Sequence, residues 1–157
     1  GRTHAPRLAQ LLGLLGALRA GKGVARTVAG TQILWRPGDD GHCIVTREPA
    51  AASRSVLALA PGAAALWDGR FEVTVARAAA ACRVGALGRE GWCLIRRHER
   101  PAVAYDIALS QPAIWQRERL VAAPTLGYSR PGLDHAYRLA FAPRRPMPSN
   151  GLVYGLV

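Results

Sequence analysis

Seven side chains in this sequence have the chemistry to bind a transition metal: three cysteines and four histidines. The cysteines are Cys43, Cys82 and Cys93, an odd number without a pair at C-x-x-C spacing. Zinc sites and disulfide frameworks both require a regular spacing of their ligands or cysteines. Neither of the two nearest groups has such a spacing: His42 with Cys43, or Cys82 and Cys93 with His98. We therefore expect no metal site, and the free thiols indicate a reducing compartment.

A nucleophilic centre would need a Cys or Ser near a His base and an orienting carboxylate. Cys93, His98 and Asp106 are the nearest candidates, and their spacing does not mark a triad. The sequence also lacks the G-x-x-x-x-G-K-[ST] and G-x-G-x-x-G loops that bind nucleotide phosphates. Asp39-Asp40 fits a solvated turn better than an acid–base pair. We expect no catalytic and no cofactor-binding residue in this chain.

Charge is the most pronounced property of the composition. The chain has 21 basic and 10 acidic residues, a formal net charge of +11, and Lys22 is the only lysine. A GC-rich genome would explain the preference for Arg over Lys, but it would not explain the net charge, which attracts polyanions. Arg binds phosphate through a planar fork and stacks on bases, so nucleic acid is the polyanion that it suits best.

The basic residues concentrate in two segments. The first precedes Asp39, contains no acid and has six basic residues: Arg2, Arg7, Arg19, Lys22, Arg26 and Arg36. In the second, Trp92 and His98 are interleaved with Arg89, Arg96, Arg97 and Arg100. In RNA recognition Arg holds phosphates while a planar side chain stacks on an unpaired base. A charged strand edge that opposes aggregation, with Trp92 in the core, is the alternative reading.

The elements that position these residues begin with an amphipathic helix over residues 6–19. Its apolar residues recur at three- and four-residue spacing, and Gly21 and Gly23 end it: Leu8, Leu11, Leu12, Leu15 and Leu18. From Thr31 onward the period changes to two. Residues 31–36 and 42–47 flank a turn at 37–41 and predict a β-hairpin, and residues 71–75 predict a half-buried strand after the Asp68-Gly69 turn.

The second half of the chain predicts further short elements. Residues 83–87 and 92–96 could form a hairpin around Gly88 and Gly91, and residues 100–110 a short helix with Pro101 at its start. Residues 114–123 predict a strand interrupted by the charged turn at 117–119. Residues 136–142 could close the sheet, and the chain beyond Pro143 reads as an arm or a tail.

Two stretches of the sequence point to one enzyme family. The first is Ala25-Arg26-Thr27-Val28-Ala29-Gly30, followed by Thr46-Arg47-Glu48-Pro49 and Leu66-Trp67-Asp68-Gly69-Arg70-Phe71. The second is Pro112-Ala113-Ile114-Trp115, followed by Leu120-Val121-Ala122-Ala123-Pro124-Thr125-Leu126-Gly127-Tyr128. In this order and spacing they resemble the region after the catalytic domain of bacterial tRNA(Ile)-lysidine synthetase, especially the short alphaproteobacterial form. The resemblance extends over residues 6–143.

The resemblance implies an enzyme of the PP-loop ATP-pyrophosphatase superfamily. Such an enzyme uses ATP and Mg in its catalytic domain to adenylate the wobble cytidine of isoleucine tRNA with a CAU anticodon, and lysine then displaces AMP. The S-G-G-x-D-S loop of that domain does not occur here, and the chain begins with Gly1 rather than Met. We therefore expect a fragment of a ligase that does not bind ATP or catalyse the reaction by itself. Its expected partners are the tRNA and its own N-terminal catalytic domain.

The sequence thus predicts an α+β fold: an N-terminal amphipathic helix, then a small mixed or antiparallel β domain with one or two short helices. Residues 1–30 would be a helical linker or the end of a middle domain, 31–143 a β-rich accessory domain and 144–157 a tail. The RNA-binding candidates are Arg19, Lys22, Arg26, Arg47, Arg70, Arg89, Arg96, Arg97 and Arg100.

Alternatives stay open at this stage. Arg47 could pair Glu48 or Asp68, and Arg70 follows a turn, so either could be structural. The whole region could also pack on a catalytic domain or mediate a homodimer without touching RNA. The sequence has neither a long apolar segment nor a secretory signal, so we expect a cytoplasmic protein that does not associate with membranes.

Overall fold

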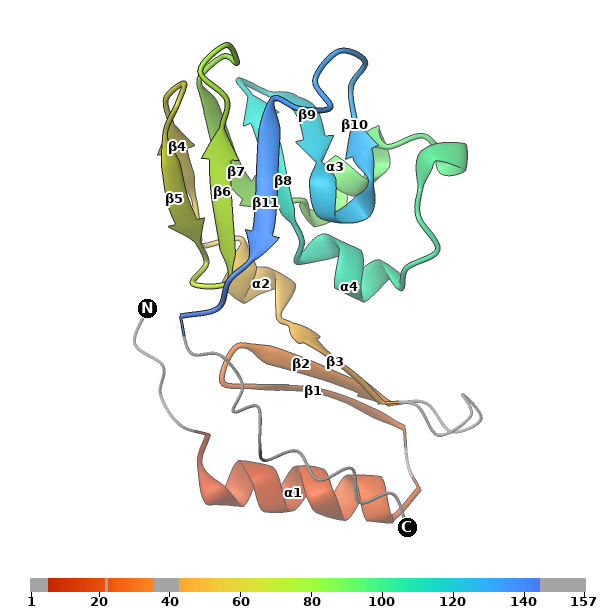
Figure 1. Ribbon diagram of the computed structural model, residues 1–157. Helices are drawn as coiled ribbons and strands as arrows, with labels where there is room; N and C mark the ends of the chain where they lie inside the picture. The colour runs from red at the N-terminus through yellow and green to blue at the C-terminus, as the bar shows by residue number, and fades with distance from the viewer. Residues whose placement is uncertain (1–5, 22, 36–42, 145–157) are drawn as a thin grey trace.

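The computed structural model describes residues 6–21, 23–35 and 43–144. The fold is α+β: an N-terminal helix is followed by antiparallel strands and a few short helices, which confirms the predicted class. Figure 1 shows a helix with a small sheet at the bottom and a larger β-rich part above them. Within the described ranges, no helix combines the length and apolar character needed to cross a membrane.

The N-terminal part is one helix and one three-stranded sheet. Its elements are α1 (Leu8–Arg19), β1 (Val24–Val28), β2 (Thr31–Trp35) and β3 (Cys43–Arg47), and the strand order is β1-β2-β3. The helix and the β2–β3 pairing confirm the predictions; the turn predicted at 37–41 lies outside the described residues. α1 packs against β1, where Leu14, Val24 and Val28 are buried.

The first strand of this sheet was not predicted. Residues 24–28 lie after the predicted helix, in the segment 1–30 that was expected to be a helical linker or the end of a middle domain. They pair with β2 through a two-residue turn in which Ala29 and Gly30 both have positive φ. This is the turn geometry that suits the twist of a hairpin. The predicted domain boundary between residues 30 and 31 falls within this turn.

The larger part has two sheets that enclose the main core. The five-stranded sheet has the order β10-β9-β8-β7-β4, and the three-stranded sheet has the order β11-β6-β5. Their strands are β4 (Leu57–Leu59), β5 (Ala64–Trp67), β6 (Phe71–Val75), β7 (Cys82–Ala86), β8 (Pro112–Gln116), β9 (Arg119–Ala123), β10 (Tyr128–Ser129) and β11 (Tyr137–Phe141). The core between them contains Trp67, Val73, Val84 and Ile114. In β6, buried and exposed residues alternate as predicted, because one face covers this core.

The short helices are α2 (Pro49–Ala52), α3 (Gly88–Leu94), η1 (Arg97–Glu99), α4 (Tyr105–Leu109) and η2 (Pro124–Leu126). α3, α4 and η2 pack on the other face of the five-stranded sheet and form a second core, whereas Ala52 of α2 belongs to the main core. Leu87, Ile95, Trp115 and Leu120 are buried in this second core. β8 and β9 are buried on both faces, so they read as continuous apolar runs, and the predicted interruption at residues 117–119 corresponds to the turn between them.

Two predictions for the second half of the chain were wrong. Residues 92–96 do not form a strand: Trp92 lies in α3, and Gly91 packs so tightly that a Cβ would approach Leu87 Cδ1 to 2.6 Å. The alternation of Trp92 and Leu94 resembled a strand, but tight packing of a helix on the sheet decided the structure. The helix expected over residues 100–110 is confined to α4, because Ala104 is extended and Pro101 lies before it.

Candidate nucleic-acid interface

Most arginines that the structure describes form no ion pair with a described carboxylate. Seventeen arginines lie in the described part of the chain, and within that part only Arg47 and Arg70 form ion pairs, both with Asp68. Fifteen described positive charges therefore have no described carboxylate beside them. A surface of this kind attracts polyanions over about a Debye length, roughly 8 Å at physiological ionic strength.

Three of the predicted RNA-binding arginines lie exposed on the segment from α3 to η1. Arg89 is in the first turn of α3, and Arg96 and Arg97 begin η1. We call the segment of residues 88–105 the α3–η1 corner. His98 is also exposed there, so its imidazole is available, whereas Trp92 is half-buried. The corner is thus neither the predicted strand edge nor a row of fully exposed aromatic rings.

Arg100 holds the α3–η1 corner together. Its Nε donates a hydrogen bond to the carbonyl of Ile95 at 3.0 Å, and its Nη2 donates to the carbonyl of Trp92 at 3.1 Å. Its guanidinium carbon lies 4.9 Å from the centroid of the Trp92 ring. A cation–π contact of this kind contributes about 0.5–1 kcal/mol where it is exposed to water. Arg100 and Trp92 therefore have a structural role, which leaves fewer donors for an external phosphate.

An aromatic residue that sequence reasoning missed lies next to Trp92. Tyr105, at the start of α4, packs edge-on against Trp92 with the ring centroids 5.9 Å apart, and it remains 43% exposed. The ring that could stack on an unpaired base at this corner is therefore that of Tyr105 more than that of Trp92. Only the contact between α3 and α4 reveals it, since thirteen residues separate the two side chains in the sequence.

Arg47 and Arg70 occupy a different environment, which we call the Asp68 cluster. Arg47 donates from Nε and Nη2 to the two carboxylate oxygens of Asp68, each at 3.0 Å, and Arg70 Nε donates to Asp68 Oδ2 at 2.9 Å. The Ser55 hydroxyl donates to Asp68 Oδ1 at 2.9 Å. Of the two partners considered for Arg47, the structure shows Asp68. A bidentate Arg–carboxylate pair is a strong and geometrically specific contact.

The Asp68 cluster joins distant parts of the chain. Arg47 also donates to the carbonyl of Gly30 at 3.0 Å, and Arg70 donates to the carbonyl of Ser110 at 3.1 Å. The cluster therefore connects the β1–β2 turn and β3 to the β5–β6 turn and to the end of α4. A Cβ at Gly30 would collide with the Arg47 guanidinium. Glycine is therefore favoured at position 30 for two reasons: its positive φ and the close approach of Arg47.

The carboxylate at the centre of this cluster is buried and charged. Burial by itself would raise the pKa of Asp68, but hydrogen bonds from Arg47 and Ser55, with the positive charges of Arg70 and Arg47, lower it below its usual 3.8. The Asp68 side chain is 3% exposed, whereas those of Arg47 and Arg70 are 28% and 22% exposed. With these donors engaged inside the protein, Arg47 and Arg70 are the weakest of the nine RNA-binding candidates.

The remaining candidates lie in the N-terminal part. Arg19 ends α1 and Arg26 lies in β1, and both are exposed; Lys22 lies outside the described residues. In Figure 1, α1 and α3 are in different parts of the molecule. The nine predicted residues therefore do not form one patch. Those that the structure describes divide into the α3–η1 corner, the N-terminal part and the Asp68 cluster.

The leucine stripe predicted for α1 is exposed. Leu8, Leu11, Leu12 and Leu15 are 69%, 42%, 58% and 43% exposed, and Leu14 is instead the buried leucine of the helix. At about 100° per residue, the exposed leucines lie within an arc of about 100° on the helix surface, and Leu14 lies outside this arc. A contiguous exposed apolar stripe is typical of a surface that contacts another molecule.

The three cysteines lie in different environments. Cys43 and Cys93 are exposed, and Cys82 is buried in the main core, where burial raises the pKa of its thiol. Among the residues that the structure describes, no three His, Cys, Asp or Glu side chains gather closely enough to hold a metal ion.

Comparisons with family models, curated proteins and solved structures found no match to this chain.

Proposed function

We propose that this chain is the tRNA-binding accessory region of a tRNA(Ile)-lysidine synthetase. The single observation that supports the RNA-binding part is the set of fifteen described arginines that form no ion pair with any described carboxylate. The enzyme family rests on the serial blocks around Trp67-Asp68-Gly69-Arg70-Phe71 and Pro112-Ala113-Ile114-Trp115. The ligation, with its ATP and Mg, would be performed by a catalytic domain outside this sequence.

Binding would depend mainly on phosphate contacts from exposed guanidinium groups. The strongest candidates are Arg89, Arg96 and Arg97 at the α3–η1 corner, because they are exposed and free of carboxylate partners within the described residues. Contacts of this kind position an RNA without reading its sequence. The choice of isoleucine tRNA with a CAU anticodon would then come from the combination of this region with the catalytic domain.

A fluorescence titration with labelled tRNA tests this proposal. The variant R89Q/R96Q/R97Q removes three charges at the corner. The control R77Q/R138Q/R144Q removes three exposed charges in or just after strands β6 and β11 of the β11-β6-β5 sheet. We expect the corner variant to bind at least about 10-fold more weakly, since each lost phosphate contact lowers affinity, and the control to change less. Equal losses in both variants would contradict a specific interface, and absence of tRNA binding by the wild type would refute the proposal.

A second candidate function is favoured by the exposed leucines of α1. The region could pack on a catalytic domain or on a second copy of itself without direct RNA contact. Light scattering on a size-exclusion column separates these possibilities. A dimer that the variant L8Q/L12Q abolishes, together with an absence of tRNA affinity, would favour the interaction module over the RNA-binding region.

A further inference from the structure

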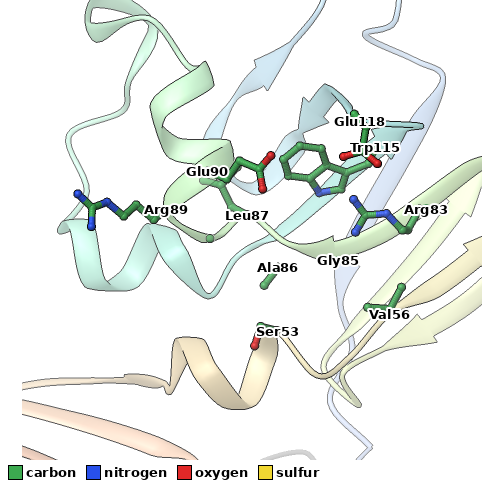
Figure 2. A pocket seen from close by; sticks show the side chains of 11 residues that line it. Ser53, Val56, Arg83, Gly85, Ala86, Leu87, Arg89, Glu90, Trp115 and Glu118 are labelled. Carbon is green, nitrogen blue, oxygen red and sulfur yellow. The ribbon is translucent and has the colours of Figure 1, made fainter.

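A pocket lies on the helix-covered face of the five-stranded sheet, and Arg89 of the α3–η1 corner is one of its lining residues. It has a volume of about 310 Å³ and lies between the end of α2, strand β7, the start of α3 and the β8–β9 turn. Figure 2 shows Arg83, Glu90, Trp115 and Glu118 gathered at one end of it, while the Arg89 side chain points away. A volume of this size accommodates one small planar ligand.

The pocket contains a buried hydrogen-bond donor without a partner among the described residues. Trp115 is 4% exposed, and its Nε1 has no hydrogen-bond acceptor in the part of the chain that the structure describes. In Figure 2 the nitrogen edge of its ring lies on the side of Arg83. Buried indole N–H groups usually have a partner. The unpaired donor therefore indicates a ligand that brings an acceptor atom.

Arg83 supplies a second donor at the same place. It is the cross-strand neighbour of Trp115, and its guanidinium carbon lies 5.3 Å from the centroid of the indole ring. Within the described residues it forms no ion pair, although Glu90 and Glu118 also line the pocket. The side chains thus offer donors, from Arg83 and Trp115, beside acceptors on two carboxylates.

Gly85 leaves the space that such a ligand needs. Its φ is not positive, so the backbone does not require glycine there, yet it is buried in β7 and lines the pocket. A Cβ at this position would lie 3.2 Å from Nη1 of Arg83. Because glycine has no Cβ, position 85 leaves space in the pocket and does not displace the Arg83 guanidinium.

We propose that this pocket binds the base of an unpaired guanine nucleotide in the RNA partner. The inference rests on the proposed RNA-binding function and names the nucleotide that this second site would take. Guanine carries two neighbouring acceptors, O6 and N7, for Arg83 and the Trp115 N–H, and an amino donor for a carboxylate of Glu90 or Glu118. Adenine presents an amino donor in place of O6, so Arg83 or Trp115 would face another donor and lose its hydrogen bond.

An NMR titration with 5′-GMP and 5′-AMP tests the base, and uridine pentamers with a central guanosine or adenosine test its presence in RNA. We expect the wild type to prefer guanine about 10-fold, a typical discrimination for a bidentate base contact. The variants W115F and R83Q should reduce the preference to about 2-fold or less. G85A should weaken both nucleotides, and the exposed control R138Q should change neither. Circular dichroism confirms that each variant is folded.

The outcomes separate this inference from the proposed function. Equal binding of GMP and AMP, or a preference that survives in both W115F and R83Q, would overturn the guanine pocket even if tRNA binding is retained. Guanine preference that appears with 5′-GMP but not with the pentamers would overturn RNA as the source of the base. Because Arg89 lines the pocket, the variant R96Q/R97Q separates the two sites: loss of tRNA affinity with unchanged GMP preference would support two separate sites.

Discussion

The arginines of the Asp68 cluster and those of the α3–η1 corner belong to one residue type but have opposite environments. Arg47 and Arg70 direct their guanidinium groups at one buried carboxylate. Arg96 and Arg97 are exposed, and no described carboxylate forms an ion pair with them. The first pair contributes to the stability of the fold, and the second contributes to the electrostatic field outside it. The charge of an arginine is therefore available to a partner molecule only where the fold places no carboxylate beside its guanidinium group.

The largest expected effect comes from the acid that makes this difference. Asp68→Ala leaves Arg47 and Arg70 partly buried without their common counter-charge, so we expect a loss of about 3 kcal/mol in the free energy of unfolding. Urea denaturation measures it. The control Glu72→Ala, exposed in β6, should change stability by about 0.5 kcal/mol or less. Similar losses in both variants would remove the distinction between the two groups of arginines.

A smaller effect is expected when the arginines themselves are exchanged. Arg70→Gln removes donors to Asp68 and to the carbonyl of Ser110, and its contacts with the rings of Phe71 and Trp67 at 5.2 and 5.7 Å. We expect a loss of about 2 kcal/mol, since hydrogen bonds to charged groups contribute about 1.5–3 kcal/mol. Arg96→Gln should be nearly neutral in the same urea denaturation experiment. A destabilisation by Arg96→Gln equal to that by Arg70→Gln would assign both residues to the fold.

The pH dependence of stability sharpens the role of Asp68. Its pKa is lowered in the folded protein, so its contribution is complete above the unfolded pKa of about 3.8 and is lost as the pH falls toward the folded pKa. The wild type should therefore lose stability as the pH falls below about 4, and Asp68→Asn should lack this part of the decline. Urea denaturation at a series of pH values from neutral to acid measures the difference. Parallel curves for the two proteins would show that Asp68 is not the stabilising carboxylate.

The smallest expected effect compares two buried indoles. Trp67 Nε1 donates to the carbonyl of Ser55 at 2.8 Å, whereas Trp115 Nε1 has no hydrogen-bond partner among the described residues. Both substitutions to Phe lose apolar area, but only Trp67→Phe leaves a carbonyl without its hydrogen bond. Trp67→Phe should therefore cost about 1 kcal/mol more than Trp115→Phe, measured by thermal or urea unfolding. Equal costs would indicate that the Trp115 donor is satisfied.

Sequence periodicity predicted β6 and β11, which cover only one core, and each lies close to its expected position. It also placed the helix α1, although the leucine stripe that indicated this helix is exposed. It failed where packing on both faces decides the structure, as for α3, whose Gly91 fits between Leu87 and Trp115. Short strands such as β4 and β10 have too few residues to show a period.

The candidate site was predictable in its charge and not in its geometry. The sequence identified Arg89, Arg96 and Arg97, because the surplus of arginine over acid is visible in the composition. It did not reveal the place of Tyr105 beside Trp92, which depends on a contact between two helices. Nor did it decide between a phosphate contact and an ion pair for Arg70, because that choice depends on the distance to Asp68 in the fold.

The salt dependence of tRNA binding is the most direct test of the central claim that the unpaired arginines of the α3–η1 corner bind RNA phosphates. The logarithm of affinity should fall linearly with the logarithm of salt concentration, with a slope of about 0.7–0.9 per phosphate contact. In R89Q/R96Q/R97Q the slope should be shallower by about 2–3, because up to three contacts are lost. The control R77Q/R138Q/R144Q should retain the wild-type slope. A slope unchanged in the corner variant would contradict the assignment of these arginines to an RNA interface.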